Sequence, residues 1–187
     1  MAVGTKLNPT LRRFIEAQQM FFVATAAPEG SVNLSPKGMD TLRVLSDTRV
    51  VWLNLTGSGN ETAAHLRESP RMTLMFMAMN GDARILRLYG AATYAHPGEA
   101  GWISLAEHFD NMAGSRQIFD MRIERVQISC GSGVPLYEYR GQRGLDEMLP
   151  YFDELGKDGV RVFWRKKNLV SIDGKPTGLE RITEAEP

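Results

Sequence analysis

Short apolar or alternating segments, separated by turn residues, make up most of the chain before residue 130. Phe21 to Ala26 is an apolar run that ends at Pro28-Glu29-Gly30, which indicates a buried strand followed by a turn. Between Arg84 and Tyr94, apolar and polar residues alternate as in a strand with one exposed face. The same reasoning predicts strands at residues 21–26, 32–35, 42–45, 50–55, 72–79, 84–94 and 123–129.

Three helices are expected among these strands. Asn8-Pro9 predicts the start of the first, because Asn caps helix N-termini and Pro is tolerated at the first helical position. A second helix is expected from Glu61 to Arg67. Ser69-Pro70 ends it, because the residue before a proline avoids the helical conformation. A mostly helical stretch is expected from Pro97 to about Phe109.

After residue 140 the spacing of apolar residues becomes helical rather than strand-like. Apolar residues between Leu145 and Phe152 lie at helical spacing, and a second short helix is expected from Val160 to Lys167. The polar end, from Lys175 to Pro187, is expected to be loosely ordered. We therefore expect one domain in residues 1–140, and a helical extension with a tail packed on that domain in residues 141–187.

Six or seven strands joined mainly by turns, with helices inserted at intervals, indicate a mainly β fold. The expected architecture is an antiparallel barrel with helical additions. A doubly wound parallel sheet would need a helix between most successive strands, and this order does not supply one.

Composition narrows the function classes. The 187 residues include 22 basic and 22 acidic ones, and this balance argues against a nucleic-acid binder, which needs surplus positive charge. The single cysteine, Cys130, excludes an internal disulfide and a cysteine-cluster metal site. No apolar run is long enough to span a membrane. We expect a cytoplasmic protein with no metal, no nucleic-acid partner and no membrane contact.

Two loops are the candidates for ligand binding. The segment Ser58-Gly59-Asn60-Glu61-Thr62 joins a strand to a helix, where backbone N–H groups can bind an anion. The alternative is a helix capped by Asn60 with nothing bound. In Asn33 to Gly38, Pro36 indicates an edge or a bend, from which Lys37 could reach a phosphate. The alternative there is an ordinary strand exit with a solvated lysine.

The remaining reactive side chains carry less information. His65, His96 and His108 share no metal-like spacing and are expected at the surface or as helix caps. Cys130 is expected to be buried and structural. The tryptophans, and the methionines between Met72 and Met79, are expected in the core.

The order of elements then resembles a known family. Phe22-Val23-Ala24-Thr25, Asn33 to Gly38, Gly59-Asn60-Glu61-Thr62 and Arg84 to Gly90 follow one another as in the FMN-binding split-barrel proteins, the pyridoxamine 5′-phosphate oxidase-like family. The resemblance covers about residues 10 to 130. It implies a six-stranded antiparallel split barrel, a homodimer and two FMN sites at the dimer interface.

The resemblance also implies where FMN would bind. In the family, the flavin phosphate is held by a strand and by the loop that opens the following helix, and flanking residues lie beside the flavin ring. The positions in this sequence are Ser35, Pro36, Lys37 and Gly38 on the strand, Asn60, Glu61 and Thr62 in the loop, and Trp52, Leu53 and Asn54 beside the ring.

Three departures from the family pattern matter. Glu61-Thr62 stand where the oxidases carry an Arg-Lys pair, and Ser35 stands where they carry an arginine. Phosphate affinity would then depend on Lys37, on backbone N–H groups and on Arg43 or Arg87. No histidine follows His108, so the C-terminal Arg-x-His-x-Arg substrate signature is missing. The chain resembles an uncharacterised branch of the family, and we do not expect it to make pyridoxal phosphate.

These observations predict an FMN-dependent oxidoreductase with a small-molecule substrate and no assigned catalytic acid or base. One alternative is a split-barrel protein that binds flavin, deazaflavin or haem without turnover. Another is a dimeric scaffold with no cofactor.

Overall fold

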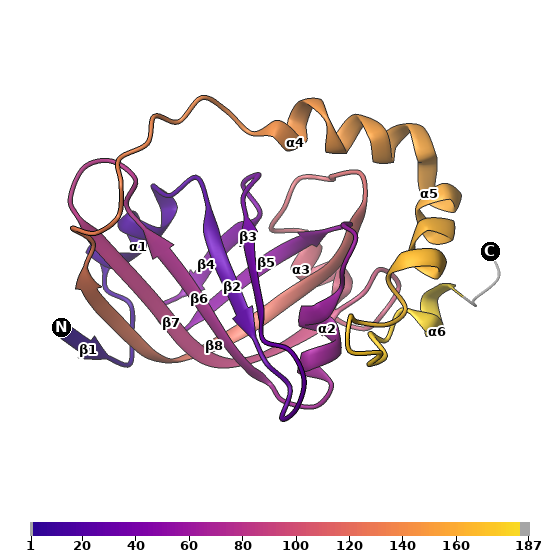
Figure 1. The fold of residues 1–187 in the computed structure, drawn as a ribbon, viewed down its shortest axis with the longest axis horizontal. Helices are drawn as coiled ribbons and strands as arrows, with labels where there is room; N and C mark the ends of the chain where they lie inside the picture. The colour runs from indigo at the N-terminus through magenta and orange to yellow at the C-terminus, as the bar shows by residue number, and fades with distance from the viewer. Residues whose placement is uncertain (1, 184–187) are drawn as a thin grey trace.

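The computed structural model describes residues 2–183. One antiparallel sheet forms the body of the molecule, in the order β3-β2-β6-β7-β8-β5-β4, with the short β1 paired to β8 (Figure 1). The strands are β1 (Ala2–Gly4), β2 (Phe21–Thr25), β3 (Asn33–Lys37), β4 (Leu42–Ser46), β5 (Arg49–Leu55), β6 (Arg71–Met77), β7 (Arg84–Ala95) and β8 (Ser115–Cys130). The helices are α1 (Pro9–Glu16), α2 (Glu61–Leu66), α3 (Trp102–Ala106), α4 (Arg143–Asp146), α5 (Met148–Lys167) and α6 (Glu180–Thr183).

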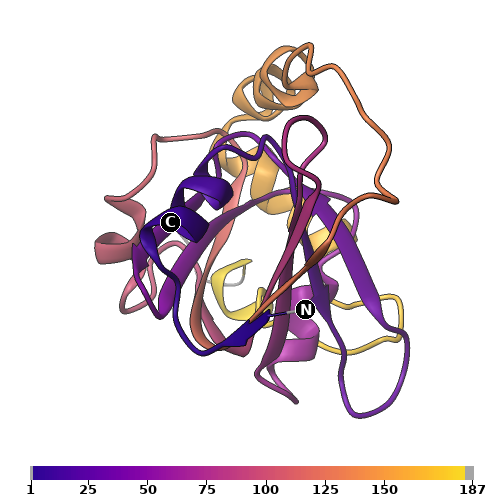
Figure 2. The same ribbon diagram turned by 90° about the vertical axis from the view of Figure 1, so that its left-hand side faces the viewer.

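The sheet curls without closing (Figure 2), because β3 and β4, at the two ends of the strand order, do not pair with each other. The expected mainly β split barrel is therefore confirmed. The expected six strands become eight in the described chain, since β1 joins the seven segments that the pattern predicts. Pro36 lies on the edge strand β3, where its missing N–H group interrupts no inner ladder.

Alternation along the strands builds the core. On β2, Phe21, Val23 and Thr25 are buried while the residues between them are only half-buried, and β6 repeats the pattern. Trp52 of β5 stacks on Phe119 of β8 with 4.4 Å between ring centroids. Helix α1 begins where expected, because Asn8 Oδ1 accepts a hydrogen bond from the Leu11 N–H group.

Two element boundaries differ from the prediction. β8 begins at Ser115, eight residues before the expected start at 123, and pairs with both β5 and β7. Its first residues, Arg116 and Gln117, are polar yet buried, so their composition suggests a loop. The expected helix at 97–109 is limited to α3, Trp102–Ala106.

The C-terminal part folds back onto the sheet. Residues 131–142 run from β8 to α4 without regular structure (Figure 1). Gly156, with φ of 63°, interrupts α5, in agreement with two predicted helical segments. The expected loose tail is wrong as far as residue 183, because Thr177 and Leu179 are fully buried. Residues 184–187 lie outside the described residues. The domain boundary at residue 140 stays a prediction.

Several side chains lie elsewhere than expected. His65 and His96 are buried, each 1% exposed, because strands and the C-terminal part cover them. His108 is exposed, as predicted. Cys130 is exposed rather than buried, and hydrogen bonds from the Ser132 hydroxyl and N–H groups lower the pKa of its thiol. Trp52, Trp164 and Met72 are buried, as expected, whereas Trp102, Met75, Met77 and Met79 are only half-buried.

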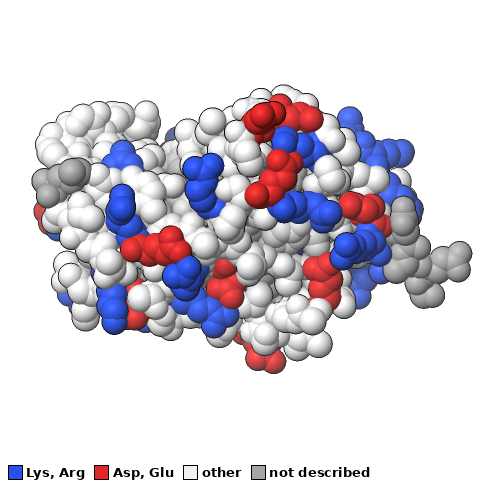
Figure 3. All heavy atoms as spheres, turned by 90° about the horizontal axis from the view of Figure 1, so that it is seen from below, with Lys and Arg blue, Asp and Glu red and all other residues white. Residues whose placement is uncertain are grey.

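One face of the molecule shows no concentration of charge. Over the face seen from below, basic and acidic side chains are interspersed (Figure 3). No helix within residues 2–183 is long and apolar enough to cross a membrane. The same residues contain no group of three or more His, Cys, Asp or Glu side chains placed to hold a metal ion.

Candidate functional site

A cavity of about 310 Å³ lies where β3, the end of β5, the loop 56–60 and the start of β8 meet. We call it the Lys37–Arg116 cavity. Its volume is within the range of small-molecule sites. Its lining is mainly polar and consists of Asn33, Ser35, Lys37, Asn54, Leu55, Gly57, Ser58, Gly59, Asn60, Glu61, Thr62 and Arg116.

Six of the ten sequence-predicted cofactor residues line this cavity: Ser35, Lys37, Asn54, Asn60, Glu61 and Thr62. The other four do not. Pro36 is exposed between two cavity-lining residues of β3, and Gly38 lines a different cavity. Trp52 and Leu53 are buried in the core. The structure thus brings the two candidate loops together, and cofactor binding by these residues stays a prediction.

Lys37 is held at the end of β3 with its ammonium group directed inward. Its Nζ donates to Asn54 Oδ1 at 3.2 Å and lies 5.3 Å from the centroid of the Trp52 ring. Burial, and secondly the charge of Arg116, lower the pKa of Lys37 to about 8. The lysine is therefore not the solvated residue of the alternative interpretation.

Arg116, which the sequence reasoning missed, is the second cation of the cavity. It is 2% exposed. Its Nε donates to Gln117 Oε1 at 3.0 Å, and its Nη2 donates to the carbonyl oxygen of Gly59 at 3.0 Å. Burial lowers its pKa to about 9, partly opposed by Glu61, so it stays charged at neutral pH. No local signal in the sequence indicates that this polar residue is enclosed.

A buried polar network fixes this arginine. Gln117 Oε1 also accepts from Asn54 Nδ2 at 2.8 Å, while Gln117 Nε2 donates to Asn60 Oδ1 at 2.8 Å. Gln117 Nε2 lies 3.4 Å from His96 Nε2. Burial lowers the pKa of His96, although Glu99 opposes the shift. Asn60 is at the start of α2, but its side chain makes no capping hydrogen bond and belongs to this network instead.

Asn33 orients the hydroxyl groups of the cavity wall. Its Nδ2 donates to Thr62 Oγ1 at 3.1 Å and to Thr25 Oγ1 at 3.3 Å, and its Oδ1 accepts from Ser35 Oγ at 2.9 Å. Ser35 and Thr62, which come from separate elements, are thereby held side by side.

The loop of the cavity is anchored from behind by residues 164–177, which we call the C-terminal segment and which do not themselves line the cavity. Asn168 Nδ2 donates to the carbonyl oxygens of Gly57 at 2.9 Å and Ser58 at 3.3 Å. Trp164 Nε1 donates to Thr56 Oγ1 at 2.8 Å. The Glu61 carboxylate accepts from the N–H group of Ile172 at 3.1 Å. Glu61 therefore anchors this segment, which gives a physical reason for an acid at a position where the resemblance leads to a cation.

The two cations of the cavity keep unused donors. Arg116 makes three hydrogen bonds with its five N–H groups, and Lys37 makes one with its three. Within the described chain, neither forms an ion pair with a carboxylate. Glu61 is the one carboxylate of the lining and forms an ion pair with neither cation, so positive charge exceeds negative charge there. Buried cations that are not fully compensated are costly, so this arrangement favours binding of an anion.

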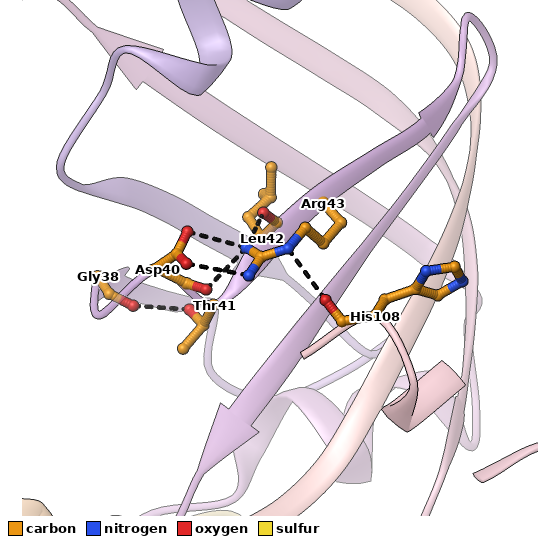
Figure 4. A network of polar contacts seen from close by, with 6 residues as sticks. All are labelled: Gly38, Asp40, Thr41, Leu42, Arg43 and His108. Carbon is orange, nitrogen blue, oxygen red and sulfur yellow. Dashed lines mark hydrogen bonds and ion pairs between the residues drawn. The ribbon is translucent and has the colours of Figure 1, made fainter. Parts of the chain in front are cut away.

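A second cavity, of about 410 Å³, lies between α1 and β4, and we call it the α1 cavity. Arg43 lies there, where its guanidinium donates to Asp40 at 2.8 and 3.0 Å and to the carbonyl oxygen of His108 at 3.0 Å (Figure 4). Arg87 donates to Ser129 Oγ and does not line the Lys37–Arg116 cavity. Neither arginine is therefore the cation suggested by the sequence departures.

The open, curled antiparallel sheet is the architecture of a split-barrel protein. The cavity with its two cations lies beside the loop that opens α2. Residues 7–130 match the family described as pyridoxamine 5′-phosphate oxidase. The chain belongs to this family.

Similar proteins agree with this assignment. The chain is 36% identical over 152 residues to the pyridoxamine 5′-phosphate oxidase family protein ustO of Aspergillus flavus. That match covers 78% of this chain but only 61% of the relative's length. The fold is similar to the crystal structure of HupZ from Group A Streptococcus, with a TM-score of 0.53 and 17% identity over 70% of this chain and 99% of that one. A crystal structure of a single-site variant of HupZ gives a TM-score of 0.51 and 17% identity over 65% of this chain and 98% of the other.

Proposed function

We propose that the protein is an FMN-dependent oxidoreductase whose flavin phosphate binds in the Lys37–Arg116 cavity. The observation that carries the proposal is the pair of desolvated cations that share one cavity and lack a carboxylate partner within residues 2–183. A phosphate monoester would supply the missing counter-charge and accept hydrogen bonds from both side chains. Membership of the pyridoxamine 5′-phosphate oxidase family supports the choice of FMN.

The residues fit the phosphate end of this cofactor. The Thr62 hydroxyl and the unbonded N–H groups of Lys37 and Arg116 offer donors around one space, while the Ser35 hydroxyl donates to Asn33. The resemblance leads to a cation at Glu61-Thr62, in the loop that opens α2. In this chain Arg116 of β8 would supply the positive charge instead. When bound, FMN supplies hydride or electron transfer, and this chain's residues would hold and orient it.

The flavin ring would lie outside this polar cavity, next to β3. The edge strand exposes Leu34, and the turn before it exposes Val32, with 63% and 75% of their surfaces accessible. Apolar side chains at an unpaired edge suit contact with a second copy of the chain. We propose a homodimer in which the partner covers the ring and a small-molecule substrate binds over its open face. The cytoplasmic location stays a prediction.

A second candidate function is flavin or deazaflavin binding without turnover. The one carboxylate that lines the cavity, Glu61, already accepts the Ile172 N–H group, so the lining offers no free carboxylate as a catalytic acid or base. None of the three histidines lines it either, so it offers no imidazole ligand to a haem iron.

The first test is the visible absorption spectrum of the purified protein, before and after FMN is added in excess. We expect a flavin spectrum that stays with the protein through gel filtration, at the elution volume of a dimer. Oxidation of a reduced nicotinamide by the loaded protein would separate the oxidoreductase from the binding protein. A protein that stays colourless with excess FMN contradicts the flavin proposal and leaves the scaffold interpretation.

A further inference from the structure

Lys37 differs from other lysines of the described chain in what surrounds its ammonium group. Lys6 and Lys175 each form an ion pair, with Asp47 and Glu68. Lys37 instead has one amide oxygen, of Asn54, and the face of a Trp52 ring. This setting stabilises the protonated form less than water does, which favours the neutral amine.

The neutral amine is therefore available near neutral pH. With a pKa of about 8, roughly one tenth of Lys37 is unprotonated at pH 7, against less than about one thousandth of an exposed lysine. A desolvated lysine beside another cation is the arrangement in which lysines attack carbonyl groups. Here the second cation is Arg116, in the same cavity.

Arg116 provides the other half of such a site. Its guanidinium is fixed by Gln117 and by the Gly59 carbonyl oxygen, and two of its N–H groups have no bond within the described residues. A ligand with an anionic group at one end and a carbonyl at the other would be held by Arg116 and presented to Lys37.

We propose that Lys37 captures small aldehydes that carry an anionic group, as a reversible imine, while Arg116 holds the anionic group. The neutral Nζ attacks the carbonyl carbon, so that a C–N bond forms and a proton moves from nitrogen to the carbonyl oxygen. The carbinolamine then loses its hydroxyl group and the remaining N–H proton as water, leaving a C=N bond. The step needs no oxidant or reductant. It goes beyond the proposed function, and an aldehyde and a flavin phosphate would exclude each other from the cavity.

The experiment compares two probes that differ only in their anionic group, glycolaldehyde phosphate and glycolaldehyde. Flavin-free full-length protein is treated with each at pH 7, the imine is reduced with cyanoborohydride, and the modified lysines are identified by peptide mass spectrometry. We expect Lys37 to be modified at least tenfold faster by the phosphorylated probe, while exposed lysines such as Lys157 react equally with both. Lys37 reacting no faster than Lys157 overturns the proposal.

Two controls test the role of Arg116. Inorganic phosphate should protect Lys37 from the phosphorylated probe and leave the labelling of Lys157 unchanged. Arg116→Gln should remove the advantage of the phosphorylated probe and slow labelling by plain glycolaldehyde, because the cation that lowers the lysine pKa is gone. The phosphate competition uses wild-type protein, so the test stands even where this variant does not fold. Labelling of Lys37 that ignores inorganic phosphate overturns the role of Arg116.

An FMN titration of the same preparation separates this proposal from the proposed function. Selective labelling without FMN binding supports the imine and contradicts the flavin proposal. FMN binding without selective labelling supports the flavin proposal and contradicts the imine. Selective labelling that FMN suppresses supports both proposals and places them in one cavity.

Discussion

In the α1 cavity, Arg43 and Arg12 each form an ion pair with a carboxylate at 2.8 Å. In the Lys37–Arg116 cavity the one lining carboxylate, Glu61, forms an ion pair with neither cation. Both cavities have similar volumes and both lie against the sheet, so size does not distinguish them. The difference is that Asp40 and Glu16 neutralise the cations of the α1 cavity internally. Cavity volume is therefore a poor guide to the site in this protein, and uncompensated charge is a better one.

Backbone strain does not identify the functional site either, because strained residues occur at the α1 cavity. Met39 and Asp40 both have positive φ, of 68° and 54°, and Asp40 lines the α1 cavity (Figure 4). Such residues cost of order 1–3 kcal/mol each and often mark functional sites. Here the turn has a structural use, because it brings Asp40 to Arg43 and Met39 against Gly144 of α4.

The largest expected effect is the loss of the buried arginine. Arg116→Gln should lower FMN affinity by about 100-fold, since charge-assisted hydrogen bonds to a phosphate are removed. Arg43→Gln, the matched change in the α1 cavity, should alter it by less than about twofold, because Arg43 is already paired. Isothermal titration with FMN measures both. Equal losses in the two variants would mean that charge pairing does not identify the site.

Lys37→Met should weaken FMN binding by about 10- to 100-fold, the effect of one charge-assisted hydrogen bond. Methionine keeps much of the length of the lysine stem, so the contact with Trp52 is largely preserved. Flavin fluorescence during titration reports the affinity, and Lys6→Met serves as the control at an exposed ion pair. Affinity unchanged by Lys37→Met would remove this lysine from the site.

The pH dependence of binding follows from the same lysine. The protonated form binds the phosphate, and its pKa without ligand is about 8. FMN affinity should therefore be highest below that value and fall by up to about tenfold between pH 7 and pH 9. Lys37→Met should abolish most of this fall. A wild-type affinity that is flat across this range would show that Lys37 does not change its charge in the site.

The sequence predicts the sheet better than it predicts the site. Phe21, Val23 and Thr25 are buried on one face of β2, and such a face follows from local alternation. Gln117 is buried beside Asn54 of β5, and Arg116 is buried against the carbonyl oxygens of Gly57 and Gly59. Nothing local shows that polar residues at a strand start will be enclosed in this way.

The C-terminal segment was unpredictable for a related reason. Asn168 and Thr177 are polar residues in an irregular stretch, which is typical of a loose tail. They are fully buried because Asn168 bonds to the carbonyl oxygens of Gly57 and Ser58, more than 100 positions earlier in the chain. Pairing at that sequence distance leaves no periodic signal in either segment.

A change at Asn168 should have a smaller effect on FMN affinity, a loss of about fivefold. Asn168→Asp removes the donor that holds the Gly57 and Ser58 carbonyl oxygens and places carboxylate oxygens against them, so the cavity loop should loosen. Asp173→Asn, in the same segment but bonded to Ser31, should leave FMN affinity unchanged. Titration of both variants, with hydrogen exchange of residues 57–60, measures the effect. Unchanged exchange in Asn168→Asp would contradict a positioning role.

The smallest expected effect is on the pH dependence of stability, and it distinguishes His96, behind the Lys37–Arg116 cavity, from His108, at the α1 cavity. Burial keeps His96 neutral beside Gln117, which holds Arg116, while His108 is exposed at the α1 cavity. Glu99, Glu180 and Arg116 also act on His96, and the net shift lowers its pKa below the unfolded value of about 6.5. The unfolded chain therefore binds the proton more readily, so this contribution to stability is full above about pH 6.5 and decreases as pH falls below it. Urea unfolding at pH 7 and pH 5.5 should show that wild type loses about 1 kcal/mol more than His96→Gln over this interval, while His108→Gln behaves as wild type. If His96→Gln lost as much stability as wild type or more, the network around Arg116 would tolerate a charged His96. The two histidines would then not differ in the way that the cations of the two cavities do.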